Sequence, residues 1–409
     1  MTGPWQERAA KGHRRGTHRL VAPGATFERV APLRARMGIT RIANVTGLDR
    51  IGIPVVMVCR PNSRSIAVSQ GKGLDLDAAR ASGLMEAVEL WHAERIGLPL
   101  RLGSFEEVSG AHRVIDLTAL PQIADSRFRP SLPMLWIEGR DLLSAAPVLL
   151  PYEMVHTNCT LPLPPGSGCF PASSNGLASG NHLLEAINHA ICEIVERDAM
   201  SVWHHVDRAT RDGTRVDLGT IDDDPCREVL GRLERAEFAA AVWDTTTDVG
   251  IPSFYCLIVD RRRETAHSGA GAGSHPSREV ALLRALTEAV QVRTTYITGS
   301  RDDLHPEEFT PPGIEQKLRG VRALMEGGGG RRDFRQIPTF ESETFADDLA
   351  WMLARLRSAS VKEVVAIDLT RPDLGIPVAR LVIPGLEGPD DHDRYVPGPR
   401  ALAARGTSA

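Results

Sequence analysis

The sequence lacks most of the features that assign a protein to a class at first sight. Its six cysteines form no Cys-x-x-Cys pair, which argues against a zinc site and a disulfide framework. No apolar run approaches the length of a membrane span, and the charged N-terminus (Glu7, Arg8, Lys11) is not that of a signal peptide. A formal charge of −4 gives no general affinity for nucleic acid or an anionic membrane. We therefore expect a cytoplasmic protein with reduced thiols.

The 409 residues suffice for one large domain or two ordinary ones. Residues 1–40 form a basic lead-in that we expect to be loosely ordered as far as residue 26. Residues 41–389 are expected to form one ATP-binding catalytic domain, and residues 390–409 a flexible tail rich in Pro, Gly and Asp. Apolar runs broken by turn residues predict a mixed α/β fold, with strands at 53–58, 65–68, 114–117, 134–137, 147–150, 239–244, 253–259, 363–369 and 376–382.

The stretch 173–205 is the most informative part of the chain. Apolar residues recur at threes and fours through it, which predicts a helix. At about 100° per residue, Glu193 lies roughly 80° and Glu196 about 20° from Glu185 around the helix axis. Three acids thus share one face, with Asn181 one turn upstream and Arg197 at its edge. Like charges so placed cost a few tenths of a kcal/mol per pair, and Mg²⁺ is the natural cation to offset them.

Two further helices carry polar stripes. Ser82, Glu86 and Glu89 lie at i, i+4 and i+7 in a helix that begins near residue 77. Arg284, Glu288 and Gln291 repeat the same spacing in a third helix, opposite an apolar face. The Gly-rich string 268–276 before that helix is expected to be a turn, which would present backbone N–H groups to an anion. Together the three stripes predict a shared cleft and a duplication-like internal plan.

The alternative to a metal site is that these acidic helix faces are simply exposed to solvent. Cations accompany the stripes, among them Lys72 before the first helix, Arg197 and Arg284. Carboxylates to hold Mg²⁺ beside cations to hold phosphate oxygens indicate a metal–nucleotide complex. No Walker A motif is present, so the prediction is ATP without a P-loop. A simple divalent-metal hydrolase would need histidines at metal-ligand spacing, which the pairs His204-His205 and His182/His189 do not provide.

The same residues resemble the three ATP-binding motifs of the YcaO family. The match rests on Ser82…Glu86…Glu89, on SNGLASGN at 174–181 with the acids that follow it, and on RALTEAVQ at 284–291. Leu90 departs from the family pattern, in which an arginine often follows the second glutamate. The resemblance implies a YcaO-like fold with mixed sheets and an ATP cleft between acidic helices. It implies Mg²⁺ or phosphate-side ligands at Glu86, Glu89, Glu193 and Glu196 with Glu185 alongside, and nucleotide contacts from Asn181, Arg197, Arg284, Glu288, Ser82, Ser69 and Lys72.

A narrower resemblance is to the YcaO proteins associated with TfuA. It is carried by residues 37–56, by RPNSRSIAVSQGKG at 60–73 and by IPGLEG at 383–388. That resemblance implies ATP-dependent thioamidation of a peptide backbone, with a TfuA-like partner, a sulfide source and a peptide substrate. A homodimer is expected from family resemblance alone, and no residue is marked as the catalytic one.

Two alternatives stay open. The first is an azoline-forming cyclodehydratase, although residues 397–409 lack the PxPxP terminus typical of that group and no leader-peptide-binding domain is evident. The second is a non-catalytic subunit that binds nucleotide and regulates a partner. The intact set of acids argues against this degenerate role.

Overall fold

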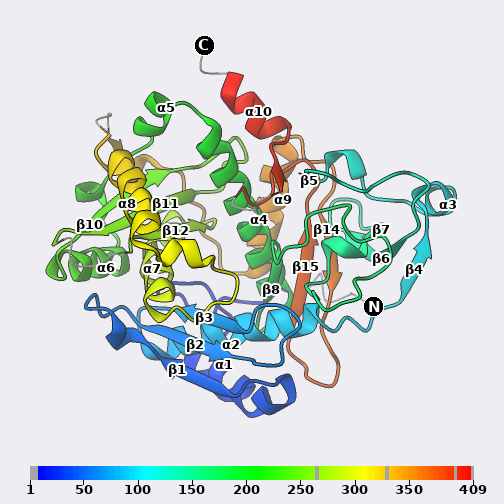
Figure 1. Ribbon diagram of the computed structural model, residues 1–409, viewed down its shortest axis with the longest axis horizontal. Coiled ribbons are helices and arrows are strands. Elements are labelled where there is room, and N and C mark those ends of the chain that lie inside the picture. Colours follow the sequence, from blue (N-terminus) through cyan, green and yellow to red (C-terminus); the bar gives the residue numbers. More distant parts are fainter. Residues whose placement is uncertain (1–7, 263–266, 328–330, 391–393, 407–409) are drawn as a thin grey trace.

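The computed structural model describes residues 8–262, 267–327, 331–390 and 394–406. Two units in it share one plan, which confirms the predicted internal duplication. In the first, the antiparallel strands β1 (Arg41–Asn44), β2 (Val55–Cys59) and β3 (Val68–Lys72) precede helix α2 (Leu76–Ala93). In the second, β10 (Phe238–Asp244), β11 (Ser253–Asp260) and β12 (Gly269–Ser274) precede α7 (Arg278–Thr298). Figure 1 shows these units in blue and in green to yellow.

The Gly-rich string is a strand, and the expectation of a turn at 268–276 was wrong. Residues Gly269–Ser274 form β12, which pairs with β11. A Cβ on Gly271 would lie 2.3 Å from the carbonyl oxygen of Ala285, so α7 packs directly on the strand backbone. Gly71 on β3 has the same role, since a Cβ there would lie 2.0 Å from the carbonyl oxygen of Ala79 on α2. The alternating glycines therefore permit close packing of helix on sheet.

A third, six-stranded antiparallel sheet supports the other side of the molecule (Figure 1). Its order is β4-β6-β14-β15-β8, with β7 also paired to β6. The strands are β4 (Leu100–Gly103), β6 (Met134–Asp141), β7 (Pro147–Pro151), β8 (Leu177–Ser179), β14 (Val365–Asp368) and β15 (Val378–Val382). The mixed α/β class predicted from the sequence is confirmed.

Helix α4 (Leu183–His205) runs through the middle of the molecule and contacts β15, β8, β12 and α9 (Phe345–Ser358) (Figure 1). It is buried on almost every side, since 17 of its 23 residues are buried. A helix buried all round needs apolar partners in several directions, and these come from α9 and β15. The acids of α4 therefore do not lie on a solvated face.

The remaining elements frame these layers. Two predicted strands differ from the structure: the strand expected at 65–68 begins only at Val68, and residues 114–117 make a single bridge, between Val114 and Leu149, before a 3-10 turn. The other elements are helices α1 (Pro23–Val30), α3 (Phe105–Ser109), α5 (Arg208–Asp212), α6 (Asp224–Arg235), α8 (Pro311–Met325) and α10 (Pro399–Gly406), and short strands β5 (Gln122–Ile123), β9 (Val216–Asp217), β13 (Arg332–Asp333) and β16 (Tyr395–Val396). In the described part of the chain, no helix is long and apolar enough to cross a membrane.

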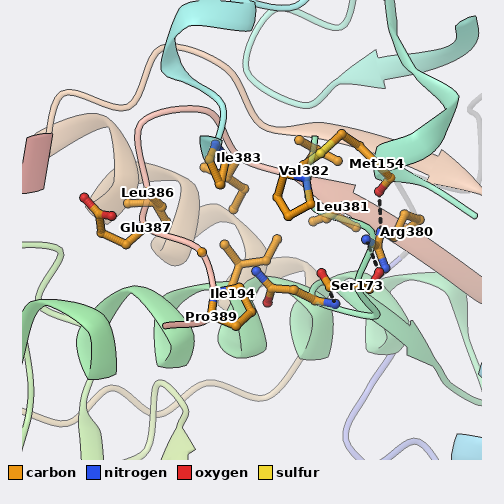
Figure 2. Close-up of a pocket in the computed structure, with 14 residues that line it drawn as sticks. Met154, Ser173, Ile194, Arg380, Leu381, Val382, Ile383, Leu386, Glu387 and Pro389 are labelled. Atoms are coloured by element: carbon orange, nitrogen blue, oxygen red, sulfur yellow. Dashed lines mark hydrogen bonds between the residues drawn. The ribbon is translucent and has the colours of Figure 1, made fainter. Parts of the chain in front are cut away.

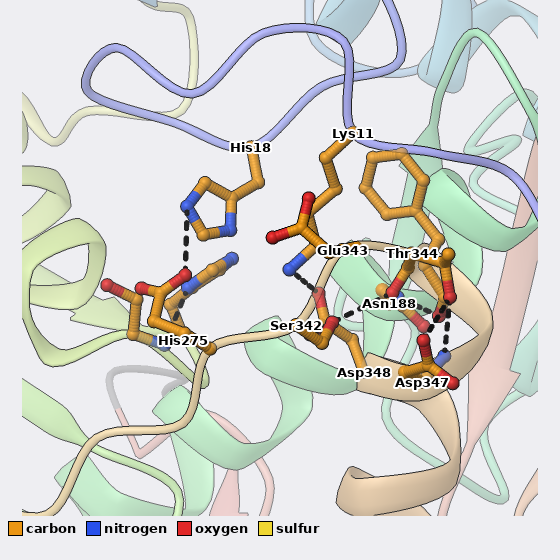
Figure 3. Close-up of polar contacts among 12 residues, drawn as sticks. Lys11, His18, Asn188, His275, Ser342, Glu343, Thr344, Asp347 and Asp348 are labelled. Carbon is orange, nitrogen blue, oxygen red and sulfur yellow. Dashed lines mark hydrogen bonds and ion pairs between the residues drawn. The ribbon is translucent and has the colours of Figure 1, made fainter.

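The basic lead-in is not loosely ordered from residue 8 onward. The ammonium group of Lys11 lies 2.7 Å from the Asp348 carboxylate on α9, and both side chains are buried. The Lys11 backbone N–H donates to the carbonyl of Glu343, and Ala10 makes a β-bridge with Thr344. Figure 3 shows Lys11 and His18 extending from this segment toward α9 and the residues that precede it. A buried ion pair and main-chain pairing thus hold the segment to the body.

The tail from residue 394 to 406 is also structured rather than flexible. The Glu387 carboxylate accepts hydrogen bonds from the backbone N–H groups of Gly398, Arg400 and Ala401 at the start of α10. Arg400 in turn pairs with Asp198 on α4 at 2.7 Å. A carboxylate at a helix N-terminus is favoured by the orphan donors and the helix dipole.

Candidate functional site

Five glutamates from three helices form what we call the acidic cluster: Glu86 and Glu89 on α2, Glu193 and Glu196 on α4, and Glu288 on α7. Their charges act on one another, because Glu86 and Glu193 both raise the pKa of Glu89 after burial, the larger cause. Glu288 acts in the same way on Glu86, Glu193 and Glu196. The structure therefore brings together acids that the sequence stripes predicted to share one site.

Local sequence sets the position of each helix. Asp75 caps α2 by accepting a hydrogen bond from the Ala78 backbone N–H at 2.8 Å. The ring of His182 does the same for α4, accepting from Leu184. On α7 the predicted apolar face is buried while Arg284, Glu288 and Gln291 are only partly buried, as expected from their spacing. Each helix thus presents its polar stripe where the sequence placed it.

Burial makes the carboxylates of the acidic cluster costly to ionise. It raises the pKa of Glu89 to about 8, although Ser179 donates to its carboxylate from both Oγ (2.7 Å) and backbone N (2.8 Å). It raises the pKa values of Glu193 and Glu196 to about 7, and that of Glu86 to about 6. Clustered carboxylates with raised pKa values are a mark of functional sites.

Five cations also act on the cluster: Lys72, Arg197, Arg284, Arg301 and Arg380. Lys72 on β3 pairs with Glu288 at 2.5 Å and so links the two repeated units. Burial works to raise the pKa of Glu288, yet the charges of Lys72 and Arg197 hold it below its ordinary value. Arg284 donates to the ring of His189 at 3.2 Å and to the carbonyl of Ser274 at 3.3 Å. Burial keeps the pKa of His189 well below its ordinary value, consistent with an acceptor nitrogen.

The first turns of α4 have different partners. Glu185 accepts hydrogen bonds from the Leu20 backbone N–H at 2.9 Å and from Asn181, and it lies 3.6 Å from the Arg19 guanidinium. Asn181 itself accepts from Thr26 and from another arginine of α1, Arg29. The predicted ligands Glu185 and Asn181 thus hold the N-terminal segment in place, and their roles toward metal and nucleotide stay predictions.

Two of the predicted nucleotide contacts, Ser82 and Ser69, lie at opposite extremes of exposure. Ser82, at the start of the α2 stripe, is exposed. Ser69 on β3 is 1% exposed, and its hydroxyl has no hydrogen-bond partner among the described residues. The amide nitrogen of the neighbouring Gln70 is in the same condition. Orphaned buried donors are rare and call for an explanation.

Sequence reasoning missed four groups that touch or influence the cluster: the Ser179 side chain, the Gln70 backbone N–H, Arg380, and Arg301, whose charge acts on Glu86. Ser179 binds Glu89, as described above, and the backbone N–H of Gln70 donates to Glu86 at 3.3 Å. Arg380 on β15 is 1% exposed, and its charge acts on Glu193. A signal for Arg380 was present, since it is a lone charge inside the apolar run 376–383, and a charge is rarely buried without a purpose.

The residues present fit a magnesium–nucleotide complex better than a bare metal site. No three His, Cys, Asp or Glu side chains in the described ranges are placed as a ready metal shell. Mg²⁺ in such complexes takes only one or two carboxylates, and phosphates and waters complete its coordination. Burial is the largest cause of the raised pKa values, so a bound cation would offset the cost of ionising these carboxylates, and the orphaned Ser69 hydroxyl adds a donor on the β3 side.

Comparisons with known proteins agree with this chemistry. A family model described as YcaO cyclodehydratase, ATP- and Mg²⁺-binding, matches residues 70–387. An uncharacterized protein in the tfuA 3′ region of Rhizobium leguminosarum bv. trifolii is 35% identical over 378 residues, which cover 90% of this chain and 88% of the relative.

Two solved structures share the fold. The structure of YcaO from Methanopyrus kandleri, bound with AMPPCP and Mg²⁺, has a TM-score of 0.76 at 23% identity and covers 96% of this chain and 98% of its own. A heterocyclase in complex with substrate and cofactor has a TM-score of 0.77 at 22% identity, but this chain spans only 54% of it. The family match over most of the chain and the Rhizobium relative show that the chain belongs to the YcaO family of ATP- and Mg²⁺-binding proteins of the cyclodehydratase type.

Proposed function

We propose that this protein uses ATP to activate a backbone amide of a peptide and thereby allows sulfide to replace the amide oxygen. The amide oxygen takes the γ-phosphoryl group of ATP, hydrosulfide adds to the amide carbon, and the C–O bond breaks. The products are a thioamide, ADP and inorganic phosphate, and their atoms and charges balance those of the reactants. Phosphorylation is needed because an amide oxygen is otherwise a very poor leaving group.

The observation that supports the proposal most strongly is the acidic cluster, in which burial raises the pKa values of four glutamates. The carboxylates that hold Mg²⁺ would come from Glu86, Glu89, Glu193 and Glu196, and we assign Glu185, at the start of α4, to the same set. When bound, Mg²⁺ neutralises phosphate charge and aligns the phosphoryl group for transfer. Because the pKa values of these carboxylates are raised, binding of that cation would complete their ionisation.

The neighbouring cations and polar groups suit the nucleotide. Lys72, held by Glu288, and Arg284, oriented by His189, would bind phosphate oxygens. Arg197 acts on the charges of Glu193 and Glu196 and would bind on the same side. We assign Asn181, Ser82, Ser69 and Glu288 to the lining of the nucleotide site.

The choice of sulfide as nucleophile is supported by the Rhizobium relative, which is described by its position 3′ of tfuA. We infer that this chain works with a TfuA-like partner that helps to deliver sulfur to the peptide. The fold shared with a heterocyclase keeps azoline formation as the second candidate. In that reaction a Cys, Ser or Thr side chain of the peptide would be the nucleophile.

Mass spectrometry of a candidate peptide incubated with the protein, a TfuA partner, sulfide and Mg²⁺-ATP tests the proposal. A mass gain equal to the difference between sulfur and oxygen, with one phosphate released per product, is expected. Glu196→Gln should abolish the gain. Glu138→Gln, which removes an exposed carboxylate on β6, should leave the gain unchanged.

The other outcomes are equally distinct. Loss of one water from the peptide would mean azoline formation by the same activation. An unchanged mass with Mg²⁺-ATP still bound in calorimetry would favour a regulatory subunit. Loss of both would contradict the ATP assignment itself.

A further inference from the structure

The N-terminal segment, residues 8–22, contacts the helices of the site although it lies outside the part of the chain that the family model matches. Its course is fixed at Gly16, whose backbone φ is +72°. A Cβ there would lie 2.8 Å from the Leu74 side chain and 3.0 Å from that of Leu283. Leu74 precedes α2 and Leu283 lies on α7. The segment therefore packs against both repeated units at one point.

Arg19 lies between two further contacts of this segment. The ring of His18 lies 4.9 Å from that of His275, just before α7, in an edge-to-face arrangement (Figure 3). On the other side, the Leu20 backbone N–H donates to Glu185 in the first turn of α4 at 2.9 Å. Arg19 is thereby held close to the N-terminal ends of both α4 and α7.

The guanidinium of Arg19 has no hydrogen-bond partner among the described residues. A carboxylate oxygen of Glu185 lies 3.6 Å from its Nη1, beyond hydrogen-bonding distance. That carboxylate already accepts from the Leu20 backbone and from Asn181. The Arg19 side chain is only 26% exposed. An arginine has five N–H donors, and here they are available to a ligand.

A second arginine near the site shows how a structural guanidinium is held. Arg380 donates from Nε to the carbonyl of Met154 at 3.0 Å and from Nη2 to that of Ser173 at 2.8 Å (Figure 2). Arg19 has no such carbonyl in the described part of the chain. A guanidinium that is mostly removed from water and makes no hydrogen bond gains free energy when an anion accepts from it.

Three cations converge on one buried histidine of α4. Burial is the main cause of the lowered pKa of His189, and the charges of Arg284, Arg19 and Lys72 lower that pKa further. Arg284 donates to the His189 ring at 3.2 Å, and its own pKa is lowered by burial and by the charge of Arg19. Like charges brought together in this way disfavour one another, and an anion bound among them removes that cost.

Positions along α4 connect these cations to the carboxylates assigned to Mg²⁺. Glu185, His189 and Glu193 follow one another at intervals of four residues, so neighbours are about 6 Å apart along the helix axis. Arg19 lies at the first position and Arg284 at the second, and the carboxylates begin at the third. A polyphosphate is an extended anion, so one of its phosphates can bind the metal while another binds the cations.

We propose that Arg19 binds a phosphate oxygen of the nucleotide and so makes the N-terminal segment one wall of the nucleotide site. The proposal rests on the proposed function, because it adds one cation to the set assigned there to phosphate. It extends the site to residues 8–22, whereas the family model match begins at residue 70.

Calorimetry of Mg²⁺-ATP with the full chain tests the proposal. Arg19→Gln should weaken binding by about 10- to 100-fold, the effect of a lost hydrogen bond to a charged group. Arg19→Lys keeps the charge and should lose less. Arg15→Gln removes the same charge from an exposed position of the same segment, and this matched control should change nothing. Denaturant titration should give equal unfolding free energies for Arg19→Gln and the unaltered protein.

Hydrogen exchange of the backbone of residues 8–22 distinguishes phosphate binding from a structural role. Without nucleotide, exchange in Arg19→Gln should equal that of the unaltered protein, because Lys11 and the Leu20 backbone still hold the segment. Mg²⁺-ATP should slow the exchange in the unaltered protein and in Arg15→Gln. It should not slow the exchange in Arg19→Gln.

Three results would overturn the proposal. The first is unchanged Mg²⁺-ATP affinity in Arg19→Gln. The second is tighter binding, which would make Arg19 a cation that competes with the metal for Glu185. The third is faster exchange of the segment in Arg19→Gln before nucleotide is added, which would assign Arg19 to holding the segment.

The peptide assay on the same samples separates this proposal from the proposed function. Mg²⁺-ATP affinity that depends on Arg19, without any mass gain in the peptide, would remove the proposed function and keep Arg19 as a phosphate ligand. A mass gain with affinity that does not depend on Arg19 would remove the Arg19 proposal alone. Absence of Mg²⁺-ATP binding in the unaltered protein would contradict both.

Discussion

Helix α2 carries two buried glutamates whose surroundings differ sharply. Glu94, the C-cap residue, is 2% exposed and accepts hydrogen bonds from Arg60, from Ser65 at 2.5 Å and from Arg95 at 2.5 Å. Glu89, five residues earlier, faces other acids, and among the described residues Ser179 is its only donor. Burial works to raise both pKa values, but the pKa of Glu94 lies below its ordinary value while that of Glu89 rises to about 8.

The difference separates two uses of a buried carboxylate. Around Glu94 the charges are matched, so the group is part of the fold and breaking the pair leaves a bare buried charge. Around Glu89 the charges are unmatched, so the folded protein pays an electrostatic cost that a divalent cation would remove. The number of hydrogen-bond donors and cations around the carboxylate, and not its burial, distinguishes the structural acid Glu94 from the functional acid Glu89.

Glu94→Gln should produce the largest effect on the folded state. It leaves the guanidinium of Arg60, itself 2% exposed, without its carboxylate. Loss of one partner from a buried pair costs about 3–5 kcal/mol of unfolding free energy, measurable by denaturant titration. Mg²⁺-ATP affinity of the folded fraction should be unchanged. A loss of stability no larger than that of the exposed control Glu138→Gln would mean that the pair is not structural.

Glu196→Gln and Glu193→Gln should lower the affinity for Mg²⁺-ATP and leave the stability of the fold intact. Each removes one like charge from the acidic cluster, so the unfolding free energy without ligand should stay equal or rise. Contacts to charged groups are worth about 1.5–3 kcal/mol, so Mg²⁺-ATP affinity should fall by roughly 10- to 100-fold for each variant, and beyond detection for both together. Calorimetry of the two variants, with Glu94→Gln measured beside them, tests this expectation. Full Mg²⁺-ATP affinity in Glu193→Gln and Glu196→Gln would contradict the functional role of these two acids.

The acidic cluster should also make stability fall as pH rises. The folded pKa values of Glu196 and Glu89, about 7 and about 8, exceed the ordinary 4.5 of the unfolded chain. Below pH 4.5 both states hold their protons, so the stabilising contribution is complete; it is lost as pH rises through the folded pKa values. Thermal unfolding between these limits should show this slope, flattened in Glu196→Gln.

Metal binding should release protons for the same reason. Mg²⁺-ATP favours ionised carboxylates, so binding near neutral pH expels the protons that Glu89 and Glu196 still hold. Calorimetry in two buffers of different ionisation enthalpy measures the number released. Equal heats in both buffers would show that the cluster is already ionised and would contradict the raised pKa values of Glu89 and Glu196.

The sequence predicted the local part of the site, which follows from helix geometry, and not the contacts between distant segments. The i, i+4, i+7 spacing sufficed to place Glu86, Glu89 and Glu288 on inward stripes, because helical geometry is local. It could not show that Lys72 pairs with Glu288 across 216 positions of chain, nor that Glu185 is engaged by Arg19 and Leu20. These contacts depend on how distant segments pack.

The prediction of a turn at the Gly-rich string 268–276 was wrong for a related reason. Glycine permits both a turn and close packing of a strand under a helix, and only the position of α7 decides between them. The N-terminal lead-in and the tail were likewise misjudged from polar composition, because Lys11 and Arg400 find buried carboxylates that no local pattern reveals.

Ser69→Ala gives the smallest expected effect and the finest test of the comparison. The Ser69 hydroxyl is buried and has no hydrogen-bond partner among the described residues, as expected of a donor to a nucleotide. Its removal should leave the unfolding free energy unchanged or slightly higher, and weaken Mg²⁺-ATP binding by roughly 2- to 10-fold, the range of one hydrogen bond. Ser104→Ala is the matched control, because that hydroxyl caps α3 and its loss should cost about 1 kcal/mol of stability with no effect on nucleotide. Unchanged Mg²⁺-ATP affinity in Ser69→Ala would mean that Ser69 does not bind the nucleotide. The groups with unmet interactions would then be the carboxylates of the acidic cluster alone.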